Sequence, residues 1–285
     1  MRRVILAVTV AVALIEPTVA HAYCRTTVCS QKKSKRPECN PGVFDGICQL
    51  AGPPLFWKEQ CTSFSVQVSG SPKYNIKPKD VEELGARAFE NWEAAVCSDG
   101  GNPNVYVKQL SEVDCDEVRY NTNGPNQNVW VFRDEEGLED PQVIALTSVS
   151  FSPDSGEIYD ADLEFNSRDY TFVVETPQNG GEVDLASVIQ HESGHILGLA
   201  HSNVPTATMA TSYGGRVEMR SLDADDFDGI CAAYPPAAAN TPALSTTCNA
   251  EPRHGFSTQC EGRDKDGCSC SVPGRNTSGT KPWGW

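Results

Sequence analysis

The stretch "HESGHILGLAHS", residues 191–202, holds three of the five histidines in a chain of 285 residues. Residues four apart on a helix lie above one another, so His191 and His195 can point their imidazoles at one ion. Glu192 lies one step round the helix, where it can reach a ligand of that ion without binding the ion itself. A helix across this stretch therefore predicts part of a metal site.

The third histidine of the stretch requires a turn in the chain. His201 follows His191 by ten residues, which is roughly 15 Å along a straight helix and far round its surface. Gly198 stands where the chain must bend, and glycine adopts the left-handed conformation that ends helices without steric cost. We therefore predict a three-histidine metal site built from a helix, a glycine bend and the strand or loop after it.

Three neutral imidazoles are typical ligands of catalytic zinc, and they leave a fourth position for water. Bound zinc lowers the pKa of that water towards neutrality and polarises a substrate carbonyl. Glu192 is then the candidate general base, which takes a proton from the attacking water and passes it to the departing amine. The pattern predicts one catalytic zinc and peptide-bond hydrolysis without a covalent intermediate, with activity lost below roughly pH 5 to 6 as the imidazoles protonate.

Other interpretations of the stretch stay open at this stage. A bare HExxH pattern also occurs on ordinary surface helices, although Gly198 and His201 at the required offsets disfavour that interpretation. A zinc-stabilised, non-catalytic binding or surface module on the same fold would need no general base, whereas Glu192 is present. A zinc exopeptidase would share the site and differ in releasing single terminal residues.

Most segments before the histidine stretch alternate like strands, whereas one earlier segment and those around the stretch have helical periodicity. Strands are predicted at 62–70, 104–110, 128–134, 143–151 and 157–165, the last two joined as a hairpin by the turn "SPDSG". Helices are predicted at 77–96, at 184–199 with Asp184 as N-cap, and from near Ser221 to 234. Strands first, with helices flanking or following them, predict an α+β domain.

Two motifs after the histidines extend the pattern. "HESGHILGLAH" is followed by "ATMATSY", which places Met209 eight residues after His201, and then by "SLDADDFDGICAAYP". Together they resemble the metzincin zinc metalloproteases, and the short gap to the methionine resembles their matrixin branch. The resemblance covers about residues 60–235, most closely 183–235. It implies a zincin fold with a twisted, mostly parallel sheet of about five strands, an antiparallel edge strand and three helices.

The resemblance also implies roles for individual residues. The three histidines of the stretch would bind zinc, and Glu192 would be the base. Met209 would form a hydrophobic floor beneath the zinc, and Tyr213 would wall the primed-side specificity pocket. Asp225 and Asp226 would brace the methionine turn and, as in some family members, pair with a new N-terminus.

Further metal sites are argued from the remaining ligands. Matrixins usually carry a second, structural zinc held by histidines, but the other histidines here are His21 and His254, at the two ends, so we predict no second zinc. "YDADLEF" supplies Asp160, Asp162 and Glu164, oxygen ligands at alternating positions that suit calcium. Alternating strand residues also share one face, so a metal-free acidic face is the alternative. Both interpretations stay open.

The two ends of the chain differ in composition from its middle. An arginine pair, an apolar run and the motif Ala20-His21-Ala22 predict a signal peptide cleaved after Ala22 and a secreted or cell-surface protein. "GCSCSVPG", 267–274, resembles the start of sorting tags of exported bacterial proteins, and Asn276 fits a glycosylation acceptor. The predicted organisation is a signal peptide 1–22, a Cys-rich extension 23–55, a catalytic domain 56–235, a Pro/Ala-rich linker 236–247 and a Cys-rich tail 248–285.

All twelve cysteines lie beyond the predicted cleavage point, and an even number in an exported chain predicts disulfides. Cys39, in "KRPECNPG", faintly resembles the cysteine that holds matrixins latent, but a disulfide is the favoured interpretation.

The net charge of −15 argues against nucleic acid and anionic membranes as partners, because both require a basic face. The apolar run near the N-terminus is too short to span a membrane comfortably, so no stable membrane span is predicted. We predict a secreted, monomeric zinc metalloendopeptidase whose partners are protein or peptide substrates, with a zinc-stabilised binding module as the alternative.

Overall fold

The computed structural model describes residues 23–30, 37–39, 43–215, 217–260 and 279–284. The predicted signal peptide, the motif "GCSCSVPG" and Asn276 lie outside these residues. Within the described ranges, none of the helices combines the length and the apolar character that crossing a membrane requires.

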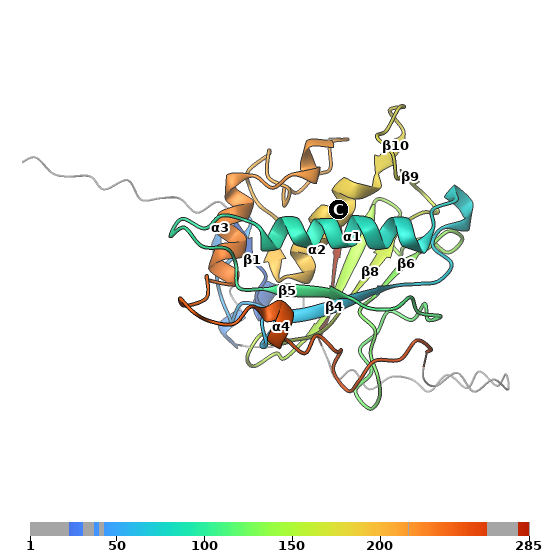
Figure 1. Ribbon diagram of the computed structural model, residues 1–285. Coiled ribbons are helices and arrows are strands. Elements are labelled where there is room, and N and C mark those ends of the chain that lie inside the picture. Colours follow the sequence, from blue (N-terminus) through green and yellow to red (C-terminus); the bar gives the residue numbers. More distant parts are fainter. Residues whose placement is uncertain (1–22, 31–36, 40–42, 216, 261–278, 285) are drawn as a thin grey trace, which may run out of the picture.

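A six-stranded sheet in the order β12-β7-β8-β6-β4-β5 forms the centre of the fold (Figure 1). β5, β4, β6 and β8 pair in parallel, and β7 is antiparallel to β8. These five strands confirm the predicted mostly parallel sheet with an antiparallel strand at one side. β12 adds a sixth strand, antiparallel to β7, that the sequence did not predict. The strands are β4 (Cys61–Val66), β5 (Tyr106–Gln109), β6 (Val129–Phe132), β7 (Ala145–Phe151), β8 (Ile158–Phe165) and β12 (Gly279–Gly284).

The predicted hairpin is formed by β7 and β8. Thr147 pairs with Leu163, and Ser148 with Asp162. The turn between the strands contains Gly156 at φ +81, a left-handed conformation that glycine adopts without steric cost. Because side chains alternate along a strand, this register points Thr147 to one face of the sheet and Ser148 to the other.

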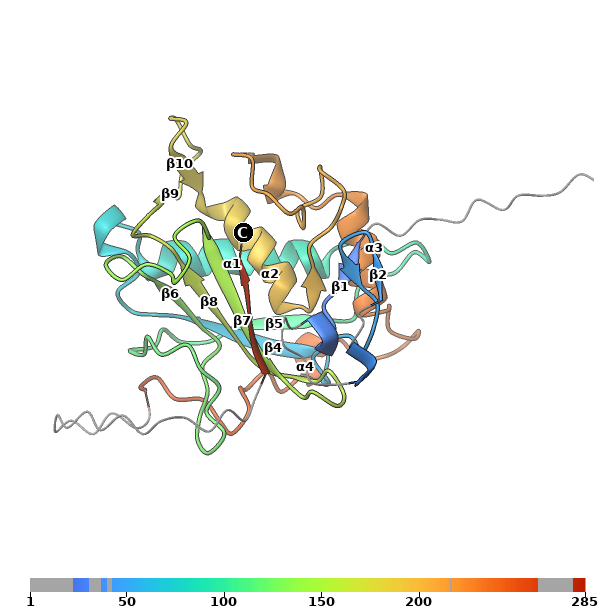
Figure 2. The same cartoon turned by 180° about the vertical axis from the view of Figure 1, so that it is seen from behind.

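Helices α1 (Pro78–Glu93) and α2 (Leu185–Ile196) pack together on one face of the sheet (Figures 1 and 2). Pro78 occupies the first turn of α1, where its missing N–H costs no helical bond. The third helix, α3 (Ala224–Ala233), begins three residues after the predicted start at Ser221. The difference arises because Asp223 caps α3 by accepting from the backbone N of Asp225, while a separate 3-10 turn, η4 (Val217–Arg220), precedes it.

The hydrophobic core lies between the sheet and these two helices. The rings of Phe64 and Trp130 stack with centroids 4.4 Å apart, and Phe89 of α1 lies 5.4 Å from Phe64. Trp92 is fully buried, and its indole Nε1 donates to the backbone oxygen of Gln190 at 3.1 Å. The core thus fixes α1 against the turn of α2 that carries the first histidine of the opening stretch.

The segment before residue 56 is held by two disulfides, Cys24–Cys48 and Cys29–Cys39, which confirms the disulfide interpretation of Cys39. Its first strand pairs antiparallel with β11 (Leu199–Ala200), directly before His201. The N-terminal extension therefore pairs with β11, the strand that leads directly to His201. Its elements are β1 (Cys24–Arg25), η1 (Val28–Ser30), η2 (Pro37–Cys39), β2 (Phe44–Asp45) and β3 (Cys48–Gln49).

Three further disulfides join distant parts of the chain. They are Cys61–Cys248, Cys97–Cys231 and Cys115–Cys260. The prediction that the cysteines form disulfides is confirmed for the ten described ones, whereas Cys268 and Cys270 lie outside the described residues. The remaining elements are η3 (Pro72–Tyr74), the parallel pair β9 (Thr171–Val173) and β10 (Glu182–Asp184), and α4 (Leu244–Thr247), which lies at the end of the predicted linker.

Candidate metal centre

The first two histidines lie on α2, whose N-terminus is held by a buried aspartate. Asp184 caps the helix by accepting from the backbone N of Ser187 at 3.0 Å, as predicted. Arg220 donates from Nε to the same carboxylate at 2.8 Å. The helix is buried along nearly its whole length, so its rotation is fixed and the imidazoles of His191 and His195 keep one direction.

The helix ends at the predicted bend. Gly198 has φ +87, and its N–H donates to the backbone oxygen of His195 at 2.9 Å. A Cβ at this position would lie 2.6 Å from the backbone oxygen of Leu55, which real Cβ atoms do not tolerate. Glycine is therefore required both by the backbone conformation and by the close approach of the N-terminal segment.

The bend brings the three histidines together. One possible ligand atom from each of His191, His195 and His201 lies within 4.8 Å of the others. The Nε2 atoms of His195 and His201 are 3.3 Å apart. No other group of three or more His, Cys, Asp or Glu side chains with this geometry occurs among the described residues.

The donor set fits zinc. The Nδ1 atoms of His191 and His195 contact the backbone oxygens of Thr208, at 2.6 Å, and Leu199, at 3.0 Å. A carbonyl oxygen can only accept, so each Nδ1 carries the proton and Nε2 is left as the basic nitrogen. Carbonyl partners of this kind commonly orient histidine ligands. Burial and the two neighbouring imidazoles lower the pKa of His191 well below its usual range, which keeps the ring neutral as zinc ligation requires.

Glu192 is completely buried beside the triad. Its Oε2 accepts from the hydroxyl of Thr147 on β7 at 2.6 Å, while Oε1 has no hydrogen-bond partner in the part of the chain that the structure describes. Burial raises the pKa of Glu192 to about 8, against the lowering effect of the bonds from Thr147. The site thus holds a carboxyl group with high proton affinity and one oxygen available for proton transfer.

The methionine turn lies against the same helix. The backbone N–H groups of Thr208 and Met209 donate to the two carboxylate oxygens of Asp226, at 2.7 and 3.0 Å. The Met209 sulfur packs against Gly194 so closely that a Cβ on Gly194 would collide with it. Asp226 therefore positions the turn whose carbonyl at Thr208 orients His191. Burial raises the pKa of Asp226 to about 6.

Asp225, the other half of the acidic pair, faces a different partner. It accepts from the hydroxyl of Ser202 at 2.5 Å, next to His201, and from the backbone of Tyr23. Tyr213 is buried, and its hydroxyl accepts from the backbone N of Asp184 at 2.7 Å. The structure thus places Tyr213 at the start of α2.

The three acids proposed as calcium ligands lie on one face of β8. Asp160 and Asp162 are buried, and Asp162 accepts from the backbone N of Val129 at 2.8 Å. Glu164 forms an ion pair with Arg133 at 2.7 Å. Burial raises the pKa of Asp160 to about 6 and that of Asp162 above its usual range. Asp160 and Asp162 therefore do not form the exposed, metal-free acidic face that was the alternative interpretation. Calcium binding at the three residues stays a prediction.

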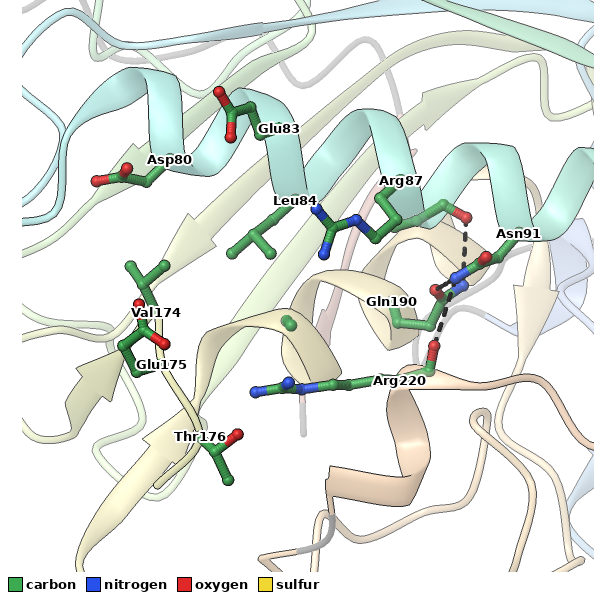
Figure 3. A pocket seen from close by; sticks show the side chains of 12 residues that line it. Asp80, Glu83, Leu84, Arg87, Asn91, Val174, Glu175, Thr176, Gln190 and Arg220 are labelled. Carbon is green, nitrogen blue, oxygen red and sulfur yellow. Dashed lines mark hydrogen bonds between the residues drawn. The ribbon is translucent and has the colours of Figure 1, made fainter. Parts of the chain in front are cut away.

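A cavity of about 270 Å³ opens between α1 and the start of α2, and it contains none of the three histidines (Figure 3). Asn91 donates to the side-chain oxygen of Gln190 at 2.7 Å across its floor. Arg87 and Arg220 extend into it from opposite sides in Figure 3. The cavity is therefore separate from the histidine cluster.

Residues that sequence reasoning missed complete the site. Thr147 lies 45 positions before Glu192 in the chain, and nothing in its strand pattern marks it. The carbonyls of Thr208 and Leu199 act through the backbone, which leaves no side-chain signature. Asp226 was not missed, because the family resemblance named it as a brace of the methionine turn.

Comparison with known proteins agrees with the family resemblance of the sequence motifs. The family model described as Matrixin matches residues 56–235. Metalloendoproteinase 1-MMP of Arabidopsis thaliana is 26% identical over 183 residues, which are 63% of this chain and 44% of that protein. Karilysin of Tannerella forsythia is 37% identical over 89 residues, 31% of this chain and 17% of that protein.

A third relative is Matrix metalloproteinase-16 of Homo sapiens, which is 42% identical over 201 residues, 63% of this chain and 27% of that protein. The chain spans less than two thirds of the length of each of these three relatives.

Proposed function

Because the chain belongs to the matrixin family, we propose that it is an exported zinc endopeptidase that hydrolyses peptide bonds within protein or peptide substrates. One observation carries the proposal. The left-handed turn at Gly198 gathers three imidazoles at one point, and a buried carboxyl group stands beside them. A structural metal site would have no use for that carboxyl group, because Glu192 adds nothing to the three-histidine ligand set.

The residues divide the chemistry between them. His191, His195 and His201 would hold the ion. When bound, zinc supplies Lewis acidity, which polarises a carbonyl group and makes a coordinated water more acidic. Glu192 takes a proton from the attacking water at a carboxylate oxygen and delivers it to the amine nitrogen as the peptide bond breaks. Thr147 holds the other oxygen, so the carboxylate keeps its direction during both transfers.

The disulfides support an extracytoplasmic location. Disulfides persist in oxidising compartments, and five connect the described cysteines. Cleavage after Ala22 would leave the α-amino group of Tyr23 as the mature N-terminus. The Tyr23 backbone already hydrogen-bonds to the Asp225 carboxylate, so we propose that the new ammonium group pairs with Asp225 next to His201.

The test is cleavage of an unstructured protein by the purified full chain. We expect cleavage between internal residues, its loss on chelation and its return with zinc. Glu192→Ala should lower kcat by about 100- to 10,000-fold while the protein still binds one zinc ion. Glu139→Ala, which changes an exposed glutamate, should behave as the unaltered protein. A wild-type protein that holds one zinc ion and cleaves no member of a peptide library would contradict the proposal and favour a binding module.

A further inference from the structure

One side of β7 offers main-chain groups to an extended peptide. β8 pairs with β7 on one side, and the other side can add a strand, as sheet edges do when they bind peptides. This edge adjoins the candidate site, because Thr147 of β7 donates to Glu192. An extended chain that pairs with β7 therefore runs directly past the residue that holds the general base.

The chain itself supplies such a strand. β12 lies along β7 in antiparallel register, with Gly279 opposite Phe151 and Gly284 opposite Leu146. Trp283 is the residue paired with Thr147. Figure 2 shows β12, in dark red, running beside β7 with its arrow pointing toward α2. The backbone of β12 thus occupies the edge of β7 at the position of the threonine that bonds to Glu192.

We propose that β12 occupies the main-chain binding site of the peptide substrate, so that a substrate must displace Gly279–Gly284 from the edge of β7 before it can be cleaved. The inference rests on the proposed function, because it requires that the site beside Glu192 accept peptides.

Covalent attachment makes this competition effective. The disulfide Cys115–Cys260 anchors the chain 19 residues before Gly279. A tethered segment acts at an effective concentration of about 1 mM. For a peptide that binds with a Kd of about 0.1 mM, an attached competitor of equal affinity weakens binding about tenfold.

The test removes the backbone pairing without removing residues. Successive residues of a strand point their N–H groups to opposite sides, so Thr280→Pro combined with Lys281→Pro must remove one donor that faces β7. The matched control is Thr280→Val combined with Lys281→Arg, which changes the same positions and keeps both N–H groups. Both pairs are placed in zinc-loaded Glu192→Ala protein, where a bound peptide is not cleaved.

The first readout is the affinity for a fluorescein-labelled peptide that copies residues 278–285, "SGTKPWGW", measured by anisotropy, with a scrambled peptide as reference. We expect the double-proline protein to bind it about tenfold more tightly than the control does. The second readout is hydrogen exchange in the unaltered chain. Among Thr280, Lys281, Trp283 and Gly284, the N–H groups that face β7 should exchange more slowly than those of the free peptide.

Each outcome decides a separate point. Equal affinity of both proteins for the peptide, including no binding to either, overturns the inference even if the wild-type chain is an active protease. Exchange of the 280–284 amides at the rate of the free peptide overturns it as well. A tenfold gain in affinity, with no cleavage by any version that retains Glu192, supports the inference and refutes the proposed function.

Discussion

Glu192 and Thr147 show how a single hydroxyl group sets the position of a candidate base. Glu192 lies on α2 and Thr147 on β7, and their bond of 2.6 Å joins the helix layer to the sheet. The hydroxyl leaves one carboxylate oxygen for proton transfer. Thr147 acts through Glu192, so we regard it as a positioning residue.

At this scale we predict that Thr147→Val, which replaces the hydroxyl by a methyl group of similar size, lowers kcat about 10- to 100-fold with little change in KM. The carboxylate then keeps the bond from the Thr147 backbone but loses the bond from the hydroxyl, and it samples unproductive directions. Thr147→Ser keeps the hydroxyl and should restore most of the activity. Steady-state kinetics of the three proteins, with zinc content measured in each, provide the check. Equal losses in the Val and Ser variants would show that packing, rather than the hydrogen bond, explains the effect.

Among the elements, β8 has an unusual polar face. Asp160 and Asp162 alternate on it and interact with each other inside the protein, and Glu164 pairs with Arg133 at its end. Two adjacent buried carboxyl groups cannot both ionise cheaply, so the pair retains a proton at a pH at which exposed aspartates have lost theirs. The strand therefore makes stability depend on pH.

We predict that the free energy of unfolding falls as the pH rises through the pKa that Asp160 has in the folded protein. The pKa of Asp160 is about 6 in the folded protein, against 3.8 as its ordinary value. The folded state therefore holds the proton more tightly than the unfolded chain. The resulting stabilisation is fully present below pH 3.8 and is lost as the pH rises through 6. A shift of this size corresponds to at most about 3 kcal/mol.

Urea unfolding in calcium-free buffer between pH 4 and pH 8 provides the measurement. Asp160→Asn should reduce the decline in the free energy of unfolding over this range, because the variant cannot bind the shared proton at that position. Asp114→Asn changes an exposed aspartate and should leave the decline as it is in the wild type. The same slope in all three proteins would refute the assignment.

At the scale of the whole molecule, disulfides join the central sheet to segments that are distant in the sequence. Cys61–Cys248 connects the start of β4 to the end of α4 across 187 residues, whereas Cys29–Cys39 closes a loop of 10 within the N-terminal extension. A cross-link restricts the unfolded chain more when its loop is longer. The two bonds should therefore contribute unequally to stability.

We predict that replacing both cysteines of the 61–248 pair by serine lowers the free energy of unfolding by about 4 kcal/mol, because the intact Cys97–Cys231 bond shortens the loop that this pair closes. The same change in the 29–39 pair should lower it by about 3 kcal/mol on the chain-entropy relation. Equilibrium unfolding in urea at one fixed pH compares the two variants with the wild type. A larger loss from the short loop would mean that packing around the N-terminal extension, which lies against Gly198, outweighs the entropy of the chain.

Several features of the molecule follow from short pieces of sequence. Residues 191–201 predict the helix, the bend and the three converging imidazoles, because helical periodicity and the left-handed preference of glycine act over a few residues. The hairpin of β7 and β8, the N-cap at Asp184 and the bracing by Asp226 also followed from local patterns or family motifs. The start of α3 was less accurate, since η4 and the cap at Asp223 divide a segment that has one continuous pattern.

The tertiary structure alone decided which groups surround the metal centre. Thr147 reaches Glu192, the Thr208 carbonyl orients His191, and β12 lies on β7 only because the chain folds distant segments together. Strand pairing and helix docking depend on register between segments tens of residues apart, and one strand pattern is compatible with many partners. By itself, the sequence predicted that the three histidines of the candidate site are its ligands and that Glu192 is its base. Contacts between distant segments determined what holds that base and what lies along the edge beside it.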